Sequence, residues 1–412
     1  MKTPGEINQK IRDGTAVVIP ADEFKRRLRD GEEFTADDLD IVTCATFGVM
    51  SGTYAVLSIP VAPPGTFRRA ESCNLNGVPA FPGPCPNERL GLIDCIVYGT
   101  AHRDGRYGGG HLFADLAAGR EILCEAVADG QTHEATITLD DCPAARLHTT
   151  RSAFRNYTAF LAEEAGVTPT IFSVTGLHGP CREISVSGCG EVNPVENDPS
   201  LRFLGPGTPI LLNGADGIIL GEGTRSTPQR PNLACSADMK GMDPLMMGGF
   251  TTSEGPECLT SVAAAVPVLD DASLQALLIR DGDIQLPIAG IEERKPRGSA
   301  DYAAVWQGTD RAVRHHPDRC ISCSPCHARI LCPAAAIRED LTIDRSLCLA
   351  CGTCQSACEA GVYRIHLGSL TYNEREIPIT LRQSERTRAE RLCRRLAGRI
   401  QEGTFLLKEG GR

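Results

Sequence analysis

The sequence predicts an α+β protein, in which a large mixed α/β N-terminal domain precedes a small cysteine-rich domain and a short strand–helix tail. Short apolar runs of helix-like and strand-like period alternate over residues 1–290, with frequent Gly and Pro between them. Eight cysteines are concentrated in residues 320–358, and an apolar stripe with helical spacing follows them. Because 412 residues exceed one small core, we divide the chain into domains at 1–300, 311–368 and 369–412.

Helices and hairpins alternate in the first domain. We expect helices at Ala21–Asp30, Thr150–Ala165 and Ser273–Asp281, the last two opening with residues suited to N-capping. REILCEAVADGQTHEATITL and GTPILLNGADGIILGEGT each place Asn-Gly or Asp-Gly between apolar runs, which predicts hairpins. The polar segment 290–310, which holds the only Trp, is interpreted as a linker.

Composition narrows the class of protein. The chain opens with the polar MKTPGEINQK, and its longest apolar run, SVAAAVPVL, is far shorter than the roughly 18 residues of a membrane span. We therefore expect a cytoplasmic protein with no membrane partner, whose 19 cysteines are ligands, nucleophiles or core residues. The net charge of −10 argues against a nucleic-acid partner, since phosphate binding needs a basic face.

The C-terminal tail differs in charge from the rest of the chain. Residues 369–412 hold ten Lys and Arg against six Glu, a balance of +4, which leaves −14 on the remainder. EIPITLR predicts a strand, and Ala389, Leu392, Leu396 and Ile400 predict one apolar face of a helix. We expect this tail to dock on the acidic remainder of the chain.

Two cysteine runs form a cassette with a diagnostic spacing. Cys348, Cys351, Cys354 and Cys358 follow C-x2-C-x2-C-x3-C, and Cys320, Cys323, Cys326 and Cys332 follow C-x2-C-x2-C-x5-C with a proline next. This is the bacterial ferredoxin pattern for two [4Fe-4S] clusters, in which the fourth cysteine of each run binds the other cluster. One predicted ligand set is therefore Cys320, Cys323, Cys326 and Cys358, and the other is Cys348, Cys351, Cys354 and Cys332.

The cassette departs from the ferredoxin pattern in two places. The gap before Cys332 is longer, and Glu359 stands where a proline usually follows the fourth cysteine. Neither departure removes a ligand. A pair of tetrahedral zinc sites is the alternative. Because a ferredoxin unit only moves single electrons, the large domain is predicted to use or supply them, with an external low-potential electron donor.

Five stretches of the chain are informative when taken together: DIVTCATFGVMSG (40–52), NGVPAFPGPCPNERLG (76–91), YGGGHLFADL (107–116), IILGEGTR (218–225) and ADMKGMDP (237–244). With these stretches the chain resembles a known family, the methanogenesis marker 16 metalloproteins of the archaeal homocysteine-biosynthesis group, which is related to L-aspartate semialdehyde sulfurtransferase. The likeness extends over nearly the whole chain.

The resemblance implies reductive sulfur insertion, in which aspartate semialdehyde, a sulfide-level sulfur donor and two electrons yield homocysteine. The ferredoxin unit would supply the electrons. Such chemistry needs a thiolate that carries sulfur as a persulfide and a cationic pocket for the substrate carboxylate. The family pattern implies a cysteine after the Met of FGxM, and this chain has Ser51 there. Cys142 matches a second family cysteine.

Ten cysteines precede the cassette, and most are expected to be buried packing residues. Cys95 and Cys124, for example, lie within apolar runs. The candidates for the catalytic thiol are Cys142, Cys85, which lies in a Pro- and Gly-rich loop, and Cys44, seven residues before Ser51.

Two further residues are candidates for binding substrate. Arg225, in GEGTR, suits a carboxylate. His111 follows three glycines that either cradle an anion or simply form a turn.

A different class of function fits the same residues. Because Ser51 replaces the expected cysteine, the chain is also consistent with an electron-transfer or assembly factor of the methanogenic machinery that performs no turnover of its own. A further alternative places an additional metal on the thiols of the large domain.

Overall fold

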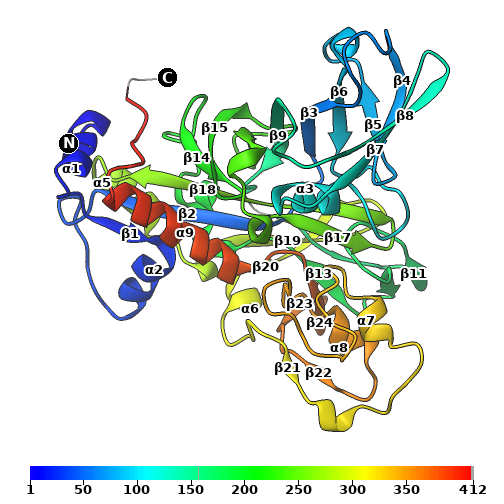
Figure 1. The fold of residues 1–412 in the computed structure, drawn as a ribbon. Helices are drawn as coiled ribbons and strands as arrows, with labels where there is room; N and C mark the ends of the chain where they lie inside the picture. The colour runs from blue at the N-terminus through cyan, green and yellow to red at the C-terminus, as the bar shows by residue number, and fades with distance from the viewer. Residues whose placement is uncertain (156, 410–412) are drawn as a thin grey trace.

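The computed structural model describes residues 1–155 and 157–409, which form an α+β protein built around a long mixed sheet (Figure 1). Its strands run in the order β1 (Val18–Pro20), β2 (Ile41–Val49), β18 (Gly255–Pro267), β14 (Pro209–Leu212), β15 (Ala215–Glu222), β16 (Leu233–Asp238), β9 (Ala144–Ser152), β3 (Thr53–Pro60), β6 (Leu92–Tyr98), β5 (Val78–Pro82), β4 (Ala70–Leu75), β7 (Ile122–Ala128) and β8 (Gln131–Ile137). β17 (Gly248–Thr252) pairs with β18 as a hairpin. The predicted hairpins are β7–β8 and β14–β15.

The centre of the long sheet is buried on both faces. β2 and β18 pair antiparallel from Val49 and Leu259 to Ile41 and Pro267, and nearly every residue of both strands is buried. Such uniformly apolar strands need cover on each side. Helix α9 (Arg386–Gln401) packs across β2 and β18, and α3 (Gly109–Ala117) packs on β17 and β18.

A smaller sheet joins segments that are distant in sequence. Its order is β20 (Pro296–Asp301), β19 (Gln285–Gly290), β10 (Ala159–Leu161), β13 (Ile184–Val186), β24 (Arg375–Arg382) and β23 (Ser369–Tyr372), and a separate pair consists of β11 (Gly166–Thr168) and β12 (Leu177–Gly179). β24 follows the cysteine cassette in sequence, yet it lies inside this sheet, parallel to β13.

Short helices lie towards the N-terminal side of the body: α1 (Pro4–Arg12), α2 (Ala21–Arg29), α4 (Pro194–Asn197) and α5 (Asp271–Leu277). Helix α6 (Ala303–Trp306) packs on β20 and β23, beside the cassette (Figure 1). Thr3 and Glu6 form a capping box at the start of α1. The predicted helix at Ala21–Asp30 corresponds to α2. No described helix is both long and apolar enough to cross a membrane.

The cysteine cassette projects from the body at the lower end of Figure 1. It contains β21 (Arg314–His315), α7 (His327–Ile330), α8 (Thr353–Ala357) and β22 (Tyr363–Arg364). β21 pairs with β22, and the Asp310 N–H donates to the His366 carbonyl at 2.8 Å. The chain therefore enters and leaves the cassette at neighbouring points.

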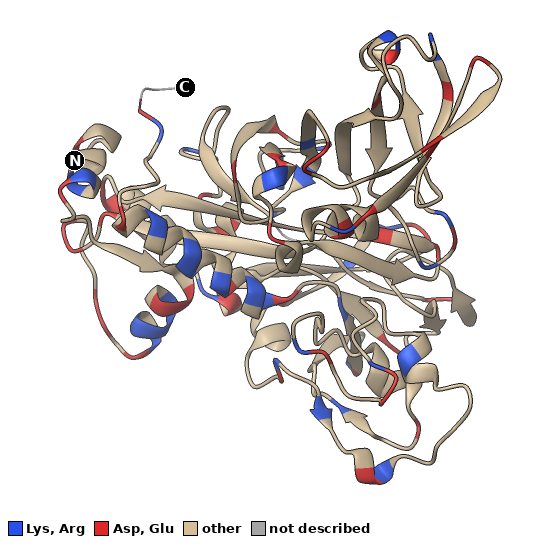
Figure 2. Ribbon diagram, in the orientation of Figure 1, with Lys and Arg blue, Asp and Glu red and all other residues tan. Residues whose placement is uncertain are grey.

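Helix α9 returns from the cassette to the body, where Ala389, Leu392, Leu396 and Ile400 are all buried. Burying each of the larger three side chains contributes about 2 kcal/mol. Figure 2 shows Lys and Arg along the outer face of this helix, as its exposed Arg391, Arg394 and Arg395 require.

Three local predictions were wrong. The segment from Thr150 to Ala165, expected to be helical, contains the end of β9 and the whole of β10; residue 156 lies outside the described residues. Thr, Phe and Tyr are frequent there, and such residues favour strands. The helix predicted at Ser273–Asp281 is present as α5, but its bounds are Asp271–Leu277 and the predicted N-cap was wrong. Asp270 caps the helix, and Ser273 occupies the third helical position of the capping box. The expected linker forms β20 and α6, and Trp306 is buried.

Candidate functional site

Four cysteines of the cassette surround one apolar pocket. Cys332, Cys348, Cys351 and Cys354 line it together with Val313, Ile337, Ile343 and Leu349. Cys332 belongs to the first cysteine run and the other three to the second, so the fold brings together the set expected if the fourth cysteines are exchanged. Burial raises the pKa of Cys351 to about 12 and also raises that of Cys348. We call this set the inner thiols.

The remaining cysteines of the cassette, Cys320, Cys323, Cys326 and Cys358, are called the outer thiols. Cys323 is exposed and the other three are partly buried. Three of them, Cys320, Cys326 and Cys358, lie near Tyr363, and the inner thiol Cys354 lies there too; burial and these thiols raise the pKa of Tyr363. Tyr363 also donates a hydrogen bond to the Leu341 carbonyl at 2.8 Å. The outer thiols are therefore the set closer to solvent.

The two cysteine runs share a backbone feature that suits thiolate ligands. Ser322 and Ala350 occupy the same place between the first two cysteines of each run, and both have positive φ, 53° and 49°. Their N–H groups donate to the sulfurs of Cys320 and Cys348, each at 3.4 Å. A left-handed conformation costs a non-glycine residue about 1–2 kcal/mol, and hydrogen bonds to sulfur tune iron–sulfur centres. The donor set therefore fits a thiolate-bound group.

The inner thiols surround a pocket and do not meet at one point. Within residues 1–155 and 157–409, no three His, Cys, Asp or Glu side chains lie close enough to hold a single metal ion. Tetrahedral zinc needs four sulfurs at about 2.3 Å from one centre.

Backbone hydrogen bonds attach the inner thiols to the body. The Thr251 N–H of β17 donates to the carbonyl of Pro333 at 3.0 Å, beside Cys332. The Arg382 N–H at the end of β24 donates to the Cys351 carbonyl at 2.9 Å. The inner thiols therefore lie against the body.

A buried carboxyl lies on the hairpin that receives the cassette. Glu257 of β18 is 5% exposed, and its Oε2 has no hydrogen-bond partner among the described residues. Burial raises the pKa of this carboxyl, which the hydrogen-bonding side chain of Ser51 opposes. Thr251, which binds Pro333, pairs in register with Pro256, the residue before Glu257. Sequence reasoning missed Glu257, because an isolated Glu in a strand gives no signal of its burial.

Two arginines approach the Ser51 turn from its other side. The Thr150 N–H donates to the Gly52 carbonyl, and the Thr224 N–H donates to the Thr150 carbonyl, both at 2.8 Å. These bonds place Arg151 and Arg225 next to the loop that holds Ser51. Arg225 is exposed, whereas burial and then the charge of Arg225 lower the pKa of Arg151. Arg151 was not predicted as a site residue, because it lies in none of the sequence motifs.

The glycines of YGGGH serve close packing. A Cβ on Gly109 would lie 2.2 Å from the Tyr98 carbonyl oxygen, and one on Gly110 would lie 2.5 Å from that of Gly248. They let α3 approach β6 and the β17–β18 hairpin. His111 is partly buried, its Nδ1 accepts from the Gly108 N–H at 3.3 Å, and burial lowers its pKa. A neutral His111 thus packs on Gly249, next to the hairpin of Glu257.

The three candidate catalytic thiols lie apart. Cys44 is fully buried in β2, and burial raises its pKa to about 12 although Lys25 lies nearby. Cys142 is also fully buried, and burial raises its pKa to about 11. Cys85 is exposed, in the loop before β6. This loop adjoins the start of β6, about 20 Å along that strand from its end near Thr53, so the fold does not bring Cys85 to Ser51.

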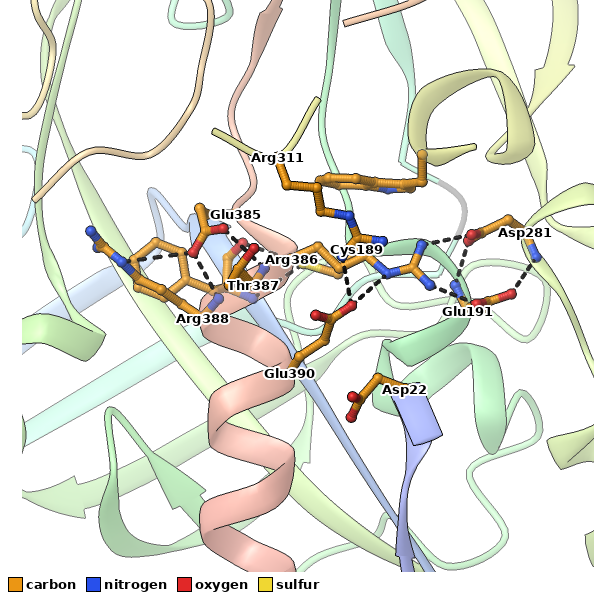
Figure 3. Close-up of polar contacts among 12 residues, drawn as sticks. Asp22, Cys189, Glu191, Asp281, Arg311, Glu385, Arg386, Thr387, Arg388 and Glu390 are labelled. Atoms are coloured by element: carbon orange, nitrogen blue, oxygen red, sulfur yellow. Dashed lines mark hydrogen bonds and ion pairs between the residues drawn. The ribbon is translucent and has the colours of Figure 1, made fainter. Parts of the chain in front are cut away.

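A buried ion network fixes the start of α9 (Figure 3). Arg386 binds Glu191 at 2.7 Å and Asp281 at 2.6 Å, and all three side chains are at most 3% exposed. Burial raises the pKa of Asp281, with Arg386 opposing it, whereas the Arg386 and Arg29 guanidiniums outweigh burial and lower the pKa of Glu191. The network ties the start of α9 to two short segments of the body, Gly190–Val192 and Asp281–Asp283.

Comparison with known proteins places this fold in a family. The family model described as "Homocysteine biosynthesis enzyme, sulfur-incorporation" matches residues 16–407. An uncharacterized protein of Methanothermobacter thermautotrophicus is 46% identical over 408 residues, 98% of this chain and 94% of that protein. An uncharacterized protein of Methanocaldococcus jannaschii is 40% identical over 397 residues, 94% of this chain and 98% of that protein.

A named enzyme is among the relatives. The L-aspartate semialdehyde sulfurtransferase of Methanocaldococcus jannaschii is 31% identical over 310 residues, which is 70% of this chain and 58% of that enzyme. No solved structure matches the chain. With nearly the whole chain matched by the family model, the protein belongs to the homocysteine biosynthesis family of sulfur-incorporation enzymes.

Proposed function

We propose that the protein inserts sulfur reductively into L-aspartate semialdehyde to give homocysteine, using electrons that enter through its cysteine cassette. The observation that carries the proposal is the attachment of the inner thiols to the β17–β18 hairpin. Through the Thr251–Pro333 hydrogen bond, the electron-transfer unit meets the hairpin that holds the buried carboxyl of Glu257 beside Ser51. The related sulfurtransferase supports the choice of substrate.

The reaction requires two electrons and two protons. Hydrogen sulfide and the aldehyde give a thioaldehyde and water, and two electrons with two protons convert the C=S group to the thiol. Two [4Fe-4S] clusters, held by the inner and outer thiols, would supply single electrons. The inner thiols are the nearer set to Glu257, as the bond from Thr251 to Pro333 indicates.

Protein side chains supply the other requirements. Glu257, whose raised pKa favours the protonated form, is the proposed proton donor to the reacting carbon or sulfur. Arg151 and Arg225 are the proposed partners of the substrate carboxylate, because guanidinium groups bind carboxylates in a two-pronged geometry. His111 packs beside the hairpin and is assigned to positioning.

The source of sulfur is proposed to be a sulfide-level donor. Cys44 and Cys142 have no exposed surface and raised pKa values, which disfavour a thiolate nucleophile. Cys85 is the exposed candidate, but it lies at the far end of β6 from Ser51. Sulfide added directly to the aldehyde needs no thiol at position 51. Trapping of protein-bound persulfide on wild type and on Cys85→Ser tests whether Cys85 carries sulfur instead.

An anaerobic assay of reconstituted protein for homocysteine from aspartate semialdehyde and sulfide tests the proposal. Cys348→Ser with Cys351→Ser should abolish product while leaving circular dichroism of the body unchanged. Cys95→Ser, at a buried packing position in β6, is the control for loss of a thiol outside the cassette. Homocysteine formation at the parental rate by the double variant, with the same reductant, would exclude the electron route.

A second function is favoured by Ser51, which stands where the family pattern implies a cysteine. A protein that passes electrons to a partner, or assists assembly, needs no nucleophile in the large domain. In that case fully loaded protein whose clusters are reducible would form no homocysteine with any sulfide-level donor, and Glu257→Gln would leave its electron transfer unchanged.

A further inference from the structure

Arg382 is a buried cation that makes no close ion pair with any described carboxylate; its guanidinium lies over the Trp306 ring, 4.6 Å from the ring centroid. It is 2% exposed, and within the described residues its guanidinium makes no ion pair. Its Nη atoms donate to the carbonyls of Val305 and Asp310 and to the hydroxyl of Thr309, and its Nε has no hydrogen-bond partner among the described residues. A buried charge is costly unless an opposite charge compensates it.

The location of Arg382 indicates where its counter-charge lies. Its own N–H donates to the carbonyl of Cys351. Its guanidinium interacts electrostatically with Glu385, with the Cys351 thiol and with Asp310, and of these only Cys351 belongs to the inner thiols. Cys351 lines the pocket of the inner thiols. A cluster held by four thiolates is an anion, and so it would compensate the charge of Arg382.

Arg388 provides a second buried cation on the same side. Its side chain is 7% exposed, and its Nη2 donates to the carbonyls of Ser346 at 2.6 Å and Cys348 at 3.4 Å. Glu385 lies 3.7 Å from its Nε and compensates it only in part, since that carboxylate also accepts the N–H groups that begin α9 (Figure 3). Both arginines thus act on the inner thiols from the body.

The outer thiols have a different electrostatic environment. Among the described residues, the buried cations are Lys25, Arg382, Arg386 and Arg388, and the last three all belong to the segment that joins β24 to α9. The arginines of the outer part of the cassette, Arg319, Arg329 and Arg364, are exposed, where water screens their charge. The cassette therefore has a cationic inner side and a solvated outer side.

We propose that Arg382 and Arg388 set the direction of electron flow through the cassette. Burial in an apolar pocket opposes the added negative charge of a reduced cluster, and these two cations offset that penalty at the inner thiols. They thereby hold the reduction potential of the inner site above that of the outer site, so that electrons enter at the outer thiols and collect beside Glu257. The inference rests on the proposed binding of two [4Fe-4S] clusters.

Anaerobic reductive titration of the reconstituted full chain, followed by electron paramagnetic resonance, tests the inference. Variants that lack the outer ligands Cys323 and Cys326, or the inner ligands Cys348 and Cys351, assign each signal to its site. In wild type the inner signal should appear first. Arg388→Gln should lower the ratio of reduced to oxidised inner cluster at least tenfold at a fixed potential, about 59 mV for one electron, and leave the outer site unchanged.

Matched variants separate charge from structure. Arg388→Lys keeps the charge and should therefore keep the ratio of reduced to oxidised inner cluster close to that of wild type. Arg345→Gln removes an exposed cation near the same Cys348 and should change the ratio less than threefold. Arg382→Gln, where it folds, should add to the effect of Arg388→Gln. An unchanged inner signal in Arg388→Gln, an equal shift at both sites, or a chain that assembles no cluster would each overturn the inference.

Homocysteine formation by the same preparations distinguishes this inference from the proposed function. If the inner signal shifts as expected but no homocysteine forms, the sulfur-insertion proposal fails and the role of the arginines stands. If homocysteine forms and the signals do not shift, the sulfur-insertion proposal stands and the role of the arginines fails.

Discussion

At the scale of single residues, the cassette and the large domain differ in what places their side chains. The spacing of the eight cysteines predicts two sets of cluster ligands, because such ligands lie close together along the chain, and the fold gathers four of these cysteines around one pocket. Glu257 and Arg151 gain their chemical character from long-range strand pairing, which spacing does not record. Burial depends on the same long-range pairing. Cys142 and Cys44 were therefore chosen as candidate catalytic thiols from the resemblance, although both are fully buried.

Glu257 predicts a pH dependence of stability. Its pKa is raised in the folded protein, so its proton stabilises the fold at low pH. As pH rises from the ordinary carboxyl value through the folded value, this contribution is lost, because the folded state must then bury a charge. Glu257→Gln should flatten that decline, seen in anaerobic melting temperatures measured between about pH 4 and pH 8. Glu222→Gln, at an exposed position of β15, is the control for removal of a carboxyl.

Arg151 predicts a substrate effect. Arg151→Gln should lower kcat/KM for aspartate semialdehyde at least tenfold, mostly through KM, because a hydrogen bond to a charged group contributes about 1.5–3 kcal/mol. Arg225→Gln should act in the same direction. Arg146→Gln, an exposed position on the same strand, is the control. Steady-state kinetics that show equal losses for Arg146 and Arg151 would remove the carboxylate role.

At the scale of elements, helix α9 was predictable and the segment 150–165 was not. Apolar residues of α9 recur every three or four positions and become buried on β2 and β18. In residues 150–165 a Thr that resembles an N-cap precedes residues that prefer strands, and sheet pairing decides the outcome. A local pattern is enough to predict a helix that packs one apolar face on the body. It fails for a segment whose strand partners are distant in sequence.

The ion network at the start of α9 predicts a large stability effect. Arg386→Met should reduce the free energy of unfolding by about 3–5 kcal/mol, since it leaves Glu191 and Asp281 buried without their cation. Arg394→Gln breaks an exposed ion pair with Asp22 on the same helix and should cost less than about 1 kcal/mol. Denaturant titration of both variants measures the contrast. Similar midpoints would show that the network is not a major source of stability.

At the scale of the whole molecule, the α+β class follows from the sequence, but the place of the C-terminal tail does not. The tail was expected to dock on an acidic body through charge. It contributes β24 inside the smaller sheet and α9 on the larger one, so apolar burial and strand pairing hold it as well as charge. Such pairing between residues more than one hundred positions apart is invisible to local reasoning.

Deletion from residue 385 onward tests this integration. The truncated chain loses α9, exposes the centre of β2 and β18, and leaves Glu191 without Arg386. We expect a lower melting temperature or insoluble protein, and faster loss of iron–sulfur absorbance in air. Deletion of 410–412 alone is the control. Unchanged melting after the longer deletion would show that the helix is an appendage.

The neighbouring entry and exit of the cassette have a consequence for its exchange. The chain leaves the body near Asp310 and returns near His366, and a backbone hydrogen bond of 2.8 Å joins those two residues. A short turn could therefore join these two residues, at the loss of the bonds that Thr251, Arg382 and Arg388 make with the cassette. The cassette thus has the geometry of a module that can be gained, lost or exchanged by a single in-frame insertion or excision.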